Sequence, residues 1–139
     1  MPTTAPLRIL AVDDEPAILQ LISAHLWPEG HSVGTASDGG EALRQYKKGG
    51  WDVVLTDRLM PYMDGDELAA AIKILHPTTP VIMVTGSLAT FEPRANVDEI
   101  VTKPFTGATL RDAIDRVLTQ NSSKAKVLKS TIPAASESA

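Results

Sequence analysis

The chain has 139 residues, of which 43% are hydrophobic and 22% are charged, and it contains no cysteine. This length predicts one compact domain, and the missing cysteines exclude disulfide scaffolds and zinc-thiolate sites. The formal net charge of -4 argues against direct binding to nucleic acid. The amino terminus has no basic segment followed by an apolar one, and no apolar run approaches the ~18 residues of a membrane span. We therefore expect a soluble, cytoplasmic protein that makes no membrane contact.

Short apolar runs that are typical of buried strands alternate along the chain with helical patterns. Strands are predicted at 7–12, 33–37, 52–56, 80–85 and 99–102. Apolar residues at spacings of three and four predict helices at 18–26, 41–48, 68–75 and 110–118. Continuous apolar runs are typical of parallel strands, because such strands are buried on both faces. The repeated strand-then-helix units therefore predict an α/β fold, a doubly wound parallel sheet of five strands with helices on both faces.

The same pattern defines the expected domain boundaries. The folded domain is predicted to span residues 7–120, and residues 1–6 are expected to be disordered. From Asn121 onward the composition shifts to Ser, Ala, Lys and Thr. A segment of this composition cannot bury enough apolar area to offset its ordering entropy. We therefore expect residues 121–139 to form a flexible tail or linker.

Ligands of a doubly wound sheet bind beyond the carboxyl ends of its strands, so the residues at these ends are the candidate site. They are Asp13, Asp14, Asp57, Thr85 and Lys103. Taken one at a time, they have ordinary explanations. Asp13-Asp14-Glu15-Pro16 is also a good helix start, and Asp57 also suits a solvated turn.

Three carboxylates on one rim require a compensating cation. Two carboxylates about 4 Å apart repel by roughly 4 kcal/mol at an effective dielectric of about 20. Lys103 is one candidate cation, and Mg²⁺ is another, because it commonly binds one or two carboxylates together with waters and a phosphate. The three histidines are scattered along the chain and do not suggest a transition-metal site.

Four short motifs stand in order along the chain, each at the end of a predicted strand. They are Val12-Asp13-Asp14-Glu15-Pro16, the stretch from Leu55 to Gly65, Val84-Thr85-Gly86 and Thr102-Lys103-Pro104-Phe105. Together they resemble the receiver domain of bacterial two-component response regulators, the CheY-like family, over residues 7–120. The resemblance implies a flavodoxin-like sheet with strand order 2-1-3-4-5 and a cis peptide between Lys103 and Pro104.

The resemblance also implies how the chain handles phosphate. Asp57 is expected to be the phosphoacceptor, which takes a phosphoryl group from a phosphohistidine of a sensor histidine kinase or phosphotransfer protein. Lys103 is expected to pair with a phosphoryl oxygen, and the Thr85 hydroxyl to move onto the phosphate and report its presence. A downstream protein or an output domain would read this change. The chemistry suits these residue types, because phosphoryl transfer depends mostly on positioning and charge neutralisation.

The expected cofactor is Mg²⁺. By resemblance, its ligands are Asp14, Asp57 and the backbone carbonyl of Leu59, while Asp13 acts through a metal-bound water. Leu59 and Ser87 stand two residues after Asp57 and Thr85, where side chains in this family modulate the attacking water. Since Leu59 cannot orient water by hydrogen bonding, slow self-dephosphorylation is expected.

Two features depart from the family pattern. Ile100 stands where the family often carries a Tyr or Phe that rotates as a switch, and an aliphatic side chain cannot flip in that way. Thr85 and Lys103 are only 18 positions apart (103 minus 85), and Pro93 interrupts the stretch between them. The fourth helix is therefore expected to be short, displaced or irregular.

Two other functions remain open at this stage. An aspartate-nucleophile phosphohydrolase also uses Mg²⁺, Asp, Thr and Lys on a doubly wound sheet, but usually with Asp-x-Asp at the first strand end and a cap domain. A pseudo-receiver keeps the fold as a phosphate-independent interaction module. The complete set of five rim residues favours a phosphoacceptor, which is not an enzyme in the usual sense because it is itself the covalent substrate. The oligomeric state is not indicated by the sequence.

Overall fold

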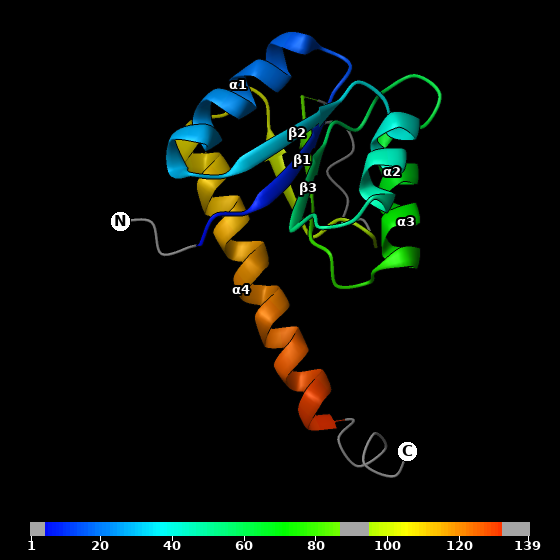
Figure 1. Cartoon of the computed structure of the whole chain (residues 1–139), viewed down its shortest axis with the longest axis vertical. Helices are drawn as coiled ribbons and strands as arrows, with labels where there is room; N and C mark the ends of the chain where they lie inside the picture. Colours follow the sequence, from blue (N-terminus) through cyan, green and yellow to red (C-terminus); the bar gives the residue numbers. More distant parts are fainter. Residues whose placement is uncertain (1–4, 87–94, 132–139) are drawn as a thin grey trace.

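Five parallel strands form one sheet in the order β2-β1-β3-β4-β5 in the computed structural model, which describes residues 5–86 and 95–131 (Figure 1). The strands are β1 (Arg8–Val12), β2 (Ser32–Ala36), β3 (Val53–Thr56), β4 (Val81–Thr85) and β5 (Glu99–Thr102). The predicted fold class and strand order are confirmed, and each predicted strand is found to within one residue at either end.

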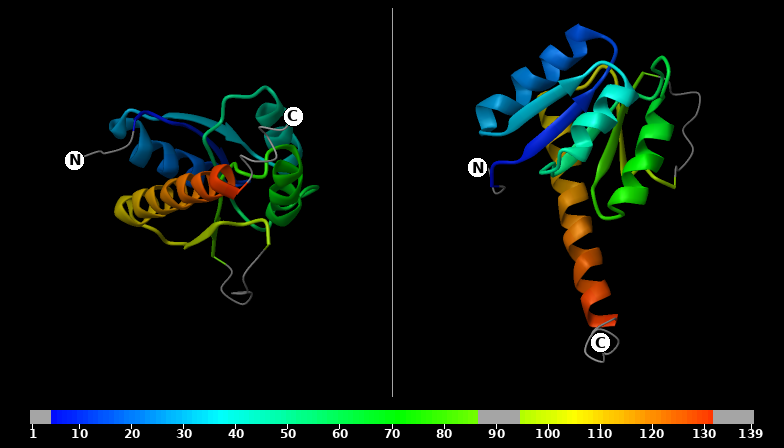
Figure 2. Two further views of the ribbon diagram at one scale, coloured as in Figure 1. Left: turned by 90° about the horizontal axis from the view of Figure 1, so that it is seen from below. Right: turned by 45° about the vertical axis from the view of Figure 1, so that its right-hand side comes forward.

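Helices cover both faces of the sheet (Figure 2). One face is covered by α1 (Pro16–Leu26) and α4 (Gly107–Thr131), and the other by α2 (Gly39–Lys47) and α3 (Gly65–Leu75). Strand β1 shows why its apolar run is continuous. Ile9 and Ala11 belong to the core under α1 and α4, whereas Leu10 and Val12 belong to the core under α2 and α3.

Two helices begin at aspartates whose side chains cap them. Asp38 accepts a hydrogen bond from the Glu41 N–H at the start of α2. At the start of α3, Asp64 and Glu67 form a reciprocal capping box, which satisfies two backbone N–H groups that a helix would otherwise leave without partners. This box fixes the position of α3 immediately after the loop that leaves β3.

The expectation about the fourth helix falls mainly on residues 87–94, which lie outside the described residues. Within the described part of the chain, no helix is assigned between β4 and β5, and residues 95–98 lead directly into β5. Asp98 anchors this approach, because its carboxylate accepts hydrogen bonds from Lys73 Nζ at 2.7 Å and from the Val81 N–H at 2.8 Å.

Helix α4 is longer than the sequence pattern suggests. The apolar repeat predicts it at 110–118, yet the backbone stays helical to Thr131 and its second half projects beyond the sheet (Figure 1). Residues 121–131 include no Gly or Pro and contain Ala, Lys and Leu, which are good helix formers. Helical backbone and membership of the folded domain are different properties, so a domain boundary at residue 120 stays a prediction. No helix in the described part of the chain is long and apolar enough to cross a membrane.

Removal of residues 121–139 should leave the domain folded. The described core residues of α4 end at Val117, with Leu118 packed against them. We expect the shortened chain to unfold cooperatively within about 5 °C of the full chain, a shift of the order of 1 kcal/mol. Thermal unfolding followed by circular dichroism measures this.

Truncation after Asp112 is the matched control, because it also removes Ala113, Ile114 and Val117 from the core and should prevent folding. Loss of cooperative unfolding on removal of residues 121–139 alone would place the domain boundary beyond residue 120.

Candidate functional site

Backbone hydrogen bonds of the parallel sheet bring the predicted site residues to one rim. The Asp57 N–H donates to the Val12 carbonyl at 2.9 Å, which holds the residue after β3 beside the end of β1. On the other side of the rim, the Lys103 N–H donates to the Thr85 carbonyl at 2.9 Å. Every site residue expected from the sequence therefore lies at the carboxyl ends of β1, β3, β4 and β5.

Three carboxylates meet at this rim. Asp13, Asp14 and Asp57 each offer an oxygen, and these oxygens lie within 4.8 Å of one another. Asp13 is 1% exposed and Asp57 is 8% exposed, whereas Asp14 faces solvent. The site is thus open on the Asp14 side and enclosed on the other two.

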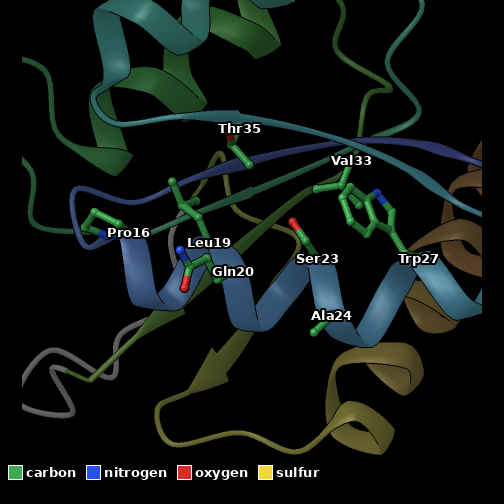
Figure 3. A pocket seen from close by; sticks show the side chains of 8 residues that line it. All are labelled: Pro16, Leu19, Gln20, Ser23, Ala24, Trp27, Val33 and Thr35. Carbon is green, nitrogen blue, oxygen red and sulfur yellow. The ribbon is translucent and has the colours of Figure 1, made fainter.

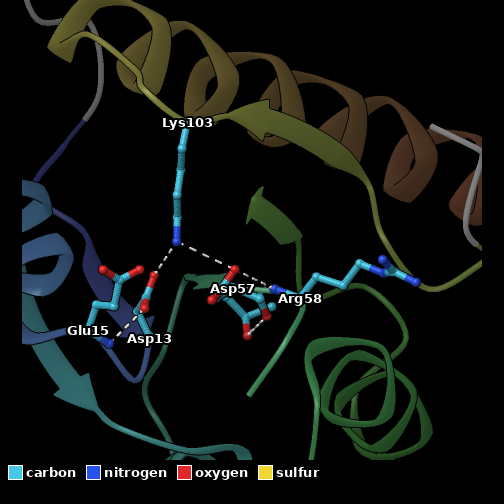
Figure 4. Close-up of polar contacts among 6 residues, drawn as sticks. Asp13, Glu15, Asp57, Arg58 and Lys103 are labelled. Atoms are coloured by element: carbon cyan, nitrogen blue, oxygen red, sulfur yellow. Dashed lines mark hydrogen bonds and ion pairs between the residues drawn. The ribbon is translucent and has the colours of Figure 1, made fainter. Parts of the chain in front are cut away.

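Lys103 is the cation that this cluster already contains (Figure 4). Its side chain extends from the end of β5 so that Nζ donates to Asp13 Oδ2 at 2.8 Å and lies 3.5 Å from Asp57 Oδ1. The peptide bond between Lys103 and Pro104 is cis, as the resemblance implies.

Asp13 is not the amino-terminal cap of α1. That helix begins with Pro16 after Glu15, and Glu15 makes no side-chain capping bond. Asp13 Oδ1 instead accepts a hydrogen bond from the Glu15 N–H at 2.9 Å, while Oδ2 accepts from Lys103. Both oxygens of Asp13 therefore have a donor, and the helix-start explanation accounts for Pro16 but not for this carboxylate.

Asp57 is held on one oxygen. Its Oδ1 accepts a hydrogen bond from the Arg58 N–H at 2.8 Å and is also the oxygen nearer to Lys103. The Arg58 guanidinium points away from the cluster (Figure 4), and its Nε lies 3.6 Å from Asp66 Oδ2. Arg58 therefore contributes its backbone, not its charge, to the site.

The electrostatics of the cluster shift two pKa values in the same direction. Burial raises the pKa of Asp57 above its ordinary value of 3.8, and the negative charge of Asp13 adds to this, against the opposing effects of Lys103 and the Arg58 N–H. For Lys103, burial alone would lower the pKa. The hydrogen bond to Asp13 and the charges of Asp13 and Asp57 outweigh burial and raise its pKa above 10.5, so this ammonium stays charged.

The remaining predicted site residues are placed as follows. Thr85 is buried at the end of β4 and is paired in register with Thr102 of β5. Leu59 lies two residues beyond Asp57, and its side chain is 60% exposed. Ser87 lies outside the described residues. The structure thus places Thr85 beside the carboxylates, while the roles expected for these side chains remain predictions.

Gly65, which is not among the site residues predicted from the sequence, supports the site. Its N–H donates to the Arg58 carbonyl at 2.8 Å, which closes the loop between β3 and α3. A Cβ at this position would collide with the backbone carbonyl oxygen of Asp57. The capping box of Asp64 and Glu67 is the signal that identifies Gly65 as the first residue of a helix.

A groove lies elsewhere, between α1 and the edge strand β2 (Figure 3). It encloses about 550 Å³ and is lined by Pro16, Leu19, Gln20, Ser23, Ala24, Trp27, Val33 and Thr35. None of these side chains is titratable. The charge and the nucleophilic oxygens lie at the strand ends instead, so the acidic rim is the candidate site.

Comparison with known proteins decides the family. Residues 9–115 match the family described as the response regulator receiver domain. The chain belongs to this family. The receiver domain is 39% identical over 120 residues to the transcriptional regulatory protein GlrR of Escherichia coli (strain K12), covering 84% of this chain and 27% of GlrR.

Solved structures agree. The chemotaxis response regulator CheY4 of Vibrio cholerae is 34% identical, with a TM-score of 0.75, over 81% of this chain and 99% of that chain. NtrX from Brucella abortus is 30% identical, with a TM-score of 0.82, over 90% of this chain and 30% of that chain. The predicted resemblance is therefore confirmed: this is a receiver domain of two-component response regulators.

Receiver domains bind Mg²⁺ through acidic residues, and the cluster of three aspartates is of that kind. As a family they are generally not enzymes, and they interact with histidine kinases and output domains. The chain spans 27% of the length of GlrR and 41% of the length of TcrA of Mycobacterium tuberculosis. These two relatives are thus much longer proteins.

Substitution of Gly65 by Ala should damage the site through the backbone of Asp57. Moving the Asp57 carbonyl away from a new Cβ requires a backbone shift, and overpacking of this kind costs about 1–3 kcal/mol. Urea unfolding measures the free energy change. Gly40→Ala is the control, because a Cβ there meets only side-chain atoms, at 3.3 Å and 3.7 Å. Equal stability of the two variants would contradict the role assigned to Gly65.

Removal of the charge at position 57 should stabilise the metal-free domain at neutral pH. The raised pKa of Asp57 means that the folded chain binds this proton more tightly than the unfolded chain. The ionised carboxylate therefore destabilises the fold at pH 7, and this penalty disappears as the pH falls through the raised pKa toward 3.8.

In EDTA we expect Asp57→Asn to raise the melting temperature at pH 7 by a few degrees, where about 1 kcal/mol corresponds to roughly 4–8 °C. The advantage should shrink as the pH is lowered. Asp112→Asn, a change at an exposed position on α4, should show neither effect. A gain that does not depend on pH would refute the electrostatic explanation.

Proposed function

We propose that this receiver domain accepts a phosphoryl group on Asp57 from a phosphohistidine of a sensor histidine kinase or phosphotransfer protein. The observation that carries this proposal is the cluster itself: Asp57 is nearly buried, next to two other carboxylates and within 3.5 Å of the Lys103 ammonium. An isolated aspartate on the surface would be solvated by water and would not need a neighbouring ammonium group. The domain acts as a phosphoacceptor and not as an enzyme that turns over a separate substrate.

The donor set fits Mg²⁺. Three carboxylates within 4.8 Å carry more negative charge than one lysine neutralises, and oxygen donors are the ligands that Mg²⁺ prefers. Asp14 and Asp57 would bind the ion directly, together with the backbone carbonyl of Leu59. Because both oxygens of Asp13 already accept hydrogen bonds, this residue is suited to act through a water molecule. When bound, the ion supplies positive charge that offsets the charge of the phosphoryl oxygens.

Asp57 Oδ2 is the oxygen that we assign as the nucleophile. The contacts given above engage Oδ1, which fixes the carboxylate plane without blocking the second oxygen. In the transfer, Oδ2 forms a bond to phosphorus as the bond between phosphorus and the histidine nitrogen breaks. The electron pair of that bond returns to the imidazole, which takes up a proton. The product is an aspartyl phosphate, a covalent species that can be hydrolysed later.

Lys103 and Thr85 are proposed to hold and report the phosphate. Lys103 already spans Asp13 and Asp57, so its Nζ can pair with a phosphoryl oxygen without leaving the site. Phosphorylation adds roughly -1.5 to -2 charges at the rim. The Thr85 hydroxyl would bind the new group. Its main chain is already hydrogen bonded to Lys103, which links β4 to the start of the loop after β5.

The partner that reads this change is also a proposal. Relatives such as GlrR are named transcriptional regulatory proteins and are much longer than this chain, and one relative is the sensor histidine kinase RcsC of Salmonella typhimurium. By analogy, a downstream protein or an output domain would respond to the phosphorylated rim. No direct contact between this domain and nucleic acid or membrane is proposed.

Phosphorylation by a small donor tests the function directly. Incubation with acetyl phosphate and Mg²⁺ should add one phosphoryl group to the chain, measured by intact mass. Asp57→Asn should abolish the increment, EDTA should suppress it, and Lys103→Ala should slow it by about 10²-fold or more, as expected for loss of an electrostatic stabiliser.

Asp112→Asn is the control and should be labelled at the wild-type rate. Absence of any increment would favour a phosphate-independent module. Continuous consumption of acetyl phosphate without a stable increment would favour a phosphohydrolase. Labelling that persists in Asp57→Asn would move the acceptor to another residue.

A further inference from the structure

An exposed aromatic residue stands in a strained turn beside the phosphorylation site. Tyr62 has a φ of +71° and is 95% exposed. On either side of it, the Met63 N–H donates to the Pro61 carbonyl at 2.9 Å, so Tyr62 is the central residue of a γ-turn with positive φ. Such turns are rare and strained, and a bulky residue with positive φ is a conformational outlier.

The ring of Tyr62 makes too little contact with the described residues to offset this strain. A side chain that is 95% exposed buries almost no apolar area against its own chain, so the ring contributes little to folding. Glycine would fill the same backbone position without strain. The positive φ of Tyr62 therefore destabilises the fold, and burial of the ring does not offset this effect. Strain of this kind is typical of functional positions.

The turn is held on both sides, so the backbone of Tyr62 has a defined position. Met60 is buried in the core under α2 and α3, and Met63 packs against the same core and against Gly39. The hydrogen bond from Gly65 to the Arg58 carbonyl closes the loop at its base. The two methionines point inward and Tyr62 points outward, between fixed neighbours.

This loop begins at Asp57 and returns to the residue next to it. Because the Gly65 N–H bonds to the Arg58 carbonyl, both ends of the loop are anchored next to the acceptor residue. Leu59, which is 60% exposed, adds a second apolar side chain to the same loop. A protein that brings a phosphohistidine to Asp57 therefore approaches the base of this loop.

We infer that Tyr62 is a docking residue for the protein that donates the phosphoryl group, with its ring packing on an apolar surface next to the donor's phosphohistidine. This inference rests on the proposed function of Asp57. Tyr is enriched among the residues that dominate binding energy at protein interfaces, and its large ring has only two side-chain torsions to order on binding. A small phosphodonor has no such surface and gains nothing from Tyr62.

The test compares a protein donor with a small donor. The protein donor is a sensor-kinase core that has been autophosphorylated from ATP, chosen from a panel as the one that phosphorylates the wild-type chain fastest. The small donor is acetyl phosphate. For Tyr62→Ala we expect kcat/KM with the kinase core to fall at least 10-fold, mainly through a higher KM, and the rate with acetyl phosphate to stay within twofold of wild type.

Three further variants separate the possible causes. Tyr62→Phe keeps the ring and should transfer within about threefold of wild type. Tyr62→Gly removes both ring and strain, so it should raise the melting temperature while losing kinase transfer as Tyr62→Ala does. Ile74→Ala is the matched control, because Ile74 is an exposed apolar side chain, 82% accessible, at the far end of α3. This substitution should leave the rates of phosphoryl transfer from both donors unchanged.

Several results would overturn the inference. Wild-type transfer from the kinase core to Tyr62→Ala would remove the docking role, and an equal loss with both donors would show that the ring shapes the site itself. Labelling by acetyl phosphate without transfer from any kinase core would refute a protein donor of this class. If acetyl phosphate does not label wild-type Asp57, the proposed function itself fails, and the docking role fails with it.

Discussion

One ammonium group shared by two nearly buried carboxylates is the interaction on which the site depends. Lys103 donates to Asp13 and lies within 3.5 Å of Asp57, and both carboxylates belong to nearly buried residues that directly follow β1 and β3. The raised pKa of Asp57 shows that this single cation does not fully offset burial and the charge of Asp13. A site with an unbalanced negative charge is prepared to bind a cation, and the exposed Asp14 leaves one side open for it.

The parallel sheet is what makes this arrangement possible. In a parallel sheet the carboxyl ends of all strands lie at one edge, so residues from positions 13, 57 and 103 meet without any long loop. The hydrogen bonds from the Asp57 N–H to the Val12 carbonyl and from the Lys103 N–H to the Thr85 carbonyl fix the positions of these residues along the strand direction. Strand β1 is buried on both faces and packs against both helix layers, so it forms a fixed base for the rim.

The sequence predicted the features that follow from the spacing of apolar residues and from the polar residues at the ends of apolar runs. The five strands and the rim of carboxylates could be predicted because apolar runs and the residues after them are local features, whereas the strand order was expected from the family resemblance alone. The capping box of Asp64 and Glu67 was equally local, but the helix was predicted from its apolar spacing alone, at 68–75, so the start of α3 at Gly65 was missed. The length of α4 was missed for a different reason: the apolar repeat stops at Leu118, whereas helical backbone continues through good helix formers that need no apolar face.

Features that depend on three-dimensional approach could not be predicted from one sequence. A glycine at position 65 does not by itself indicate that a Cβ there would collide with the Asp57 carbonyl oxygen, because the two residues approach each other only in the folded loop. The same holds for Asp13, whose two oxygens are assigned to Glu15 and Lys103 only by the fold. An aspartate can cap a helix or belong to a functional site. The hydrogen-bond partner of its side chain decides between these two roles, and for Asp13 that partner is Lys103, 90 residues further along the chain.

The connection from Thr85 to the rest of the domain is also visible only in the structure. Ile100 has no ring to flip, and in the sheet it is paired in register with Met83 of β4. The described link between Thr85 and the β5 edge is made by main chain, through the pairing with Thr102 and the hydrogen bond from Lys103. Main-chain hydrogen bonds within a sheet transmit displacement and not rotation of a side chain. If Thr85 binds the phosphate as proposed, these main-chain contacts are the route by which a change at Thr85 would displace the end of β5 next to Lys103.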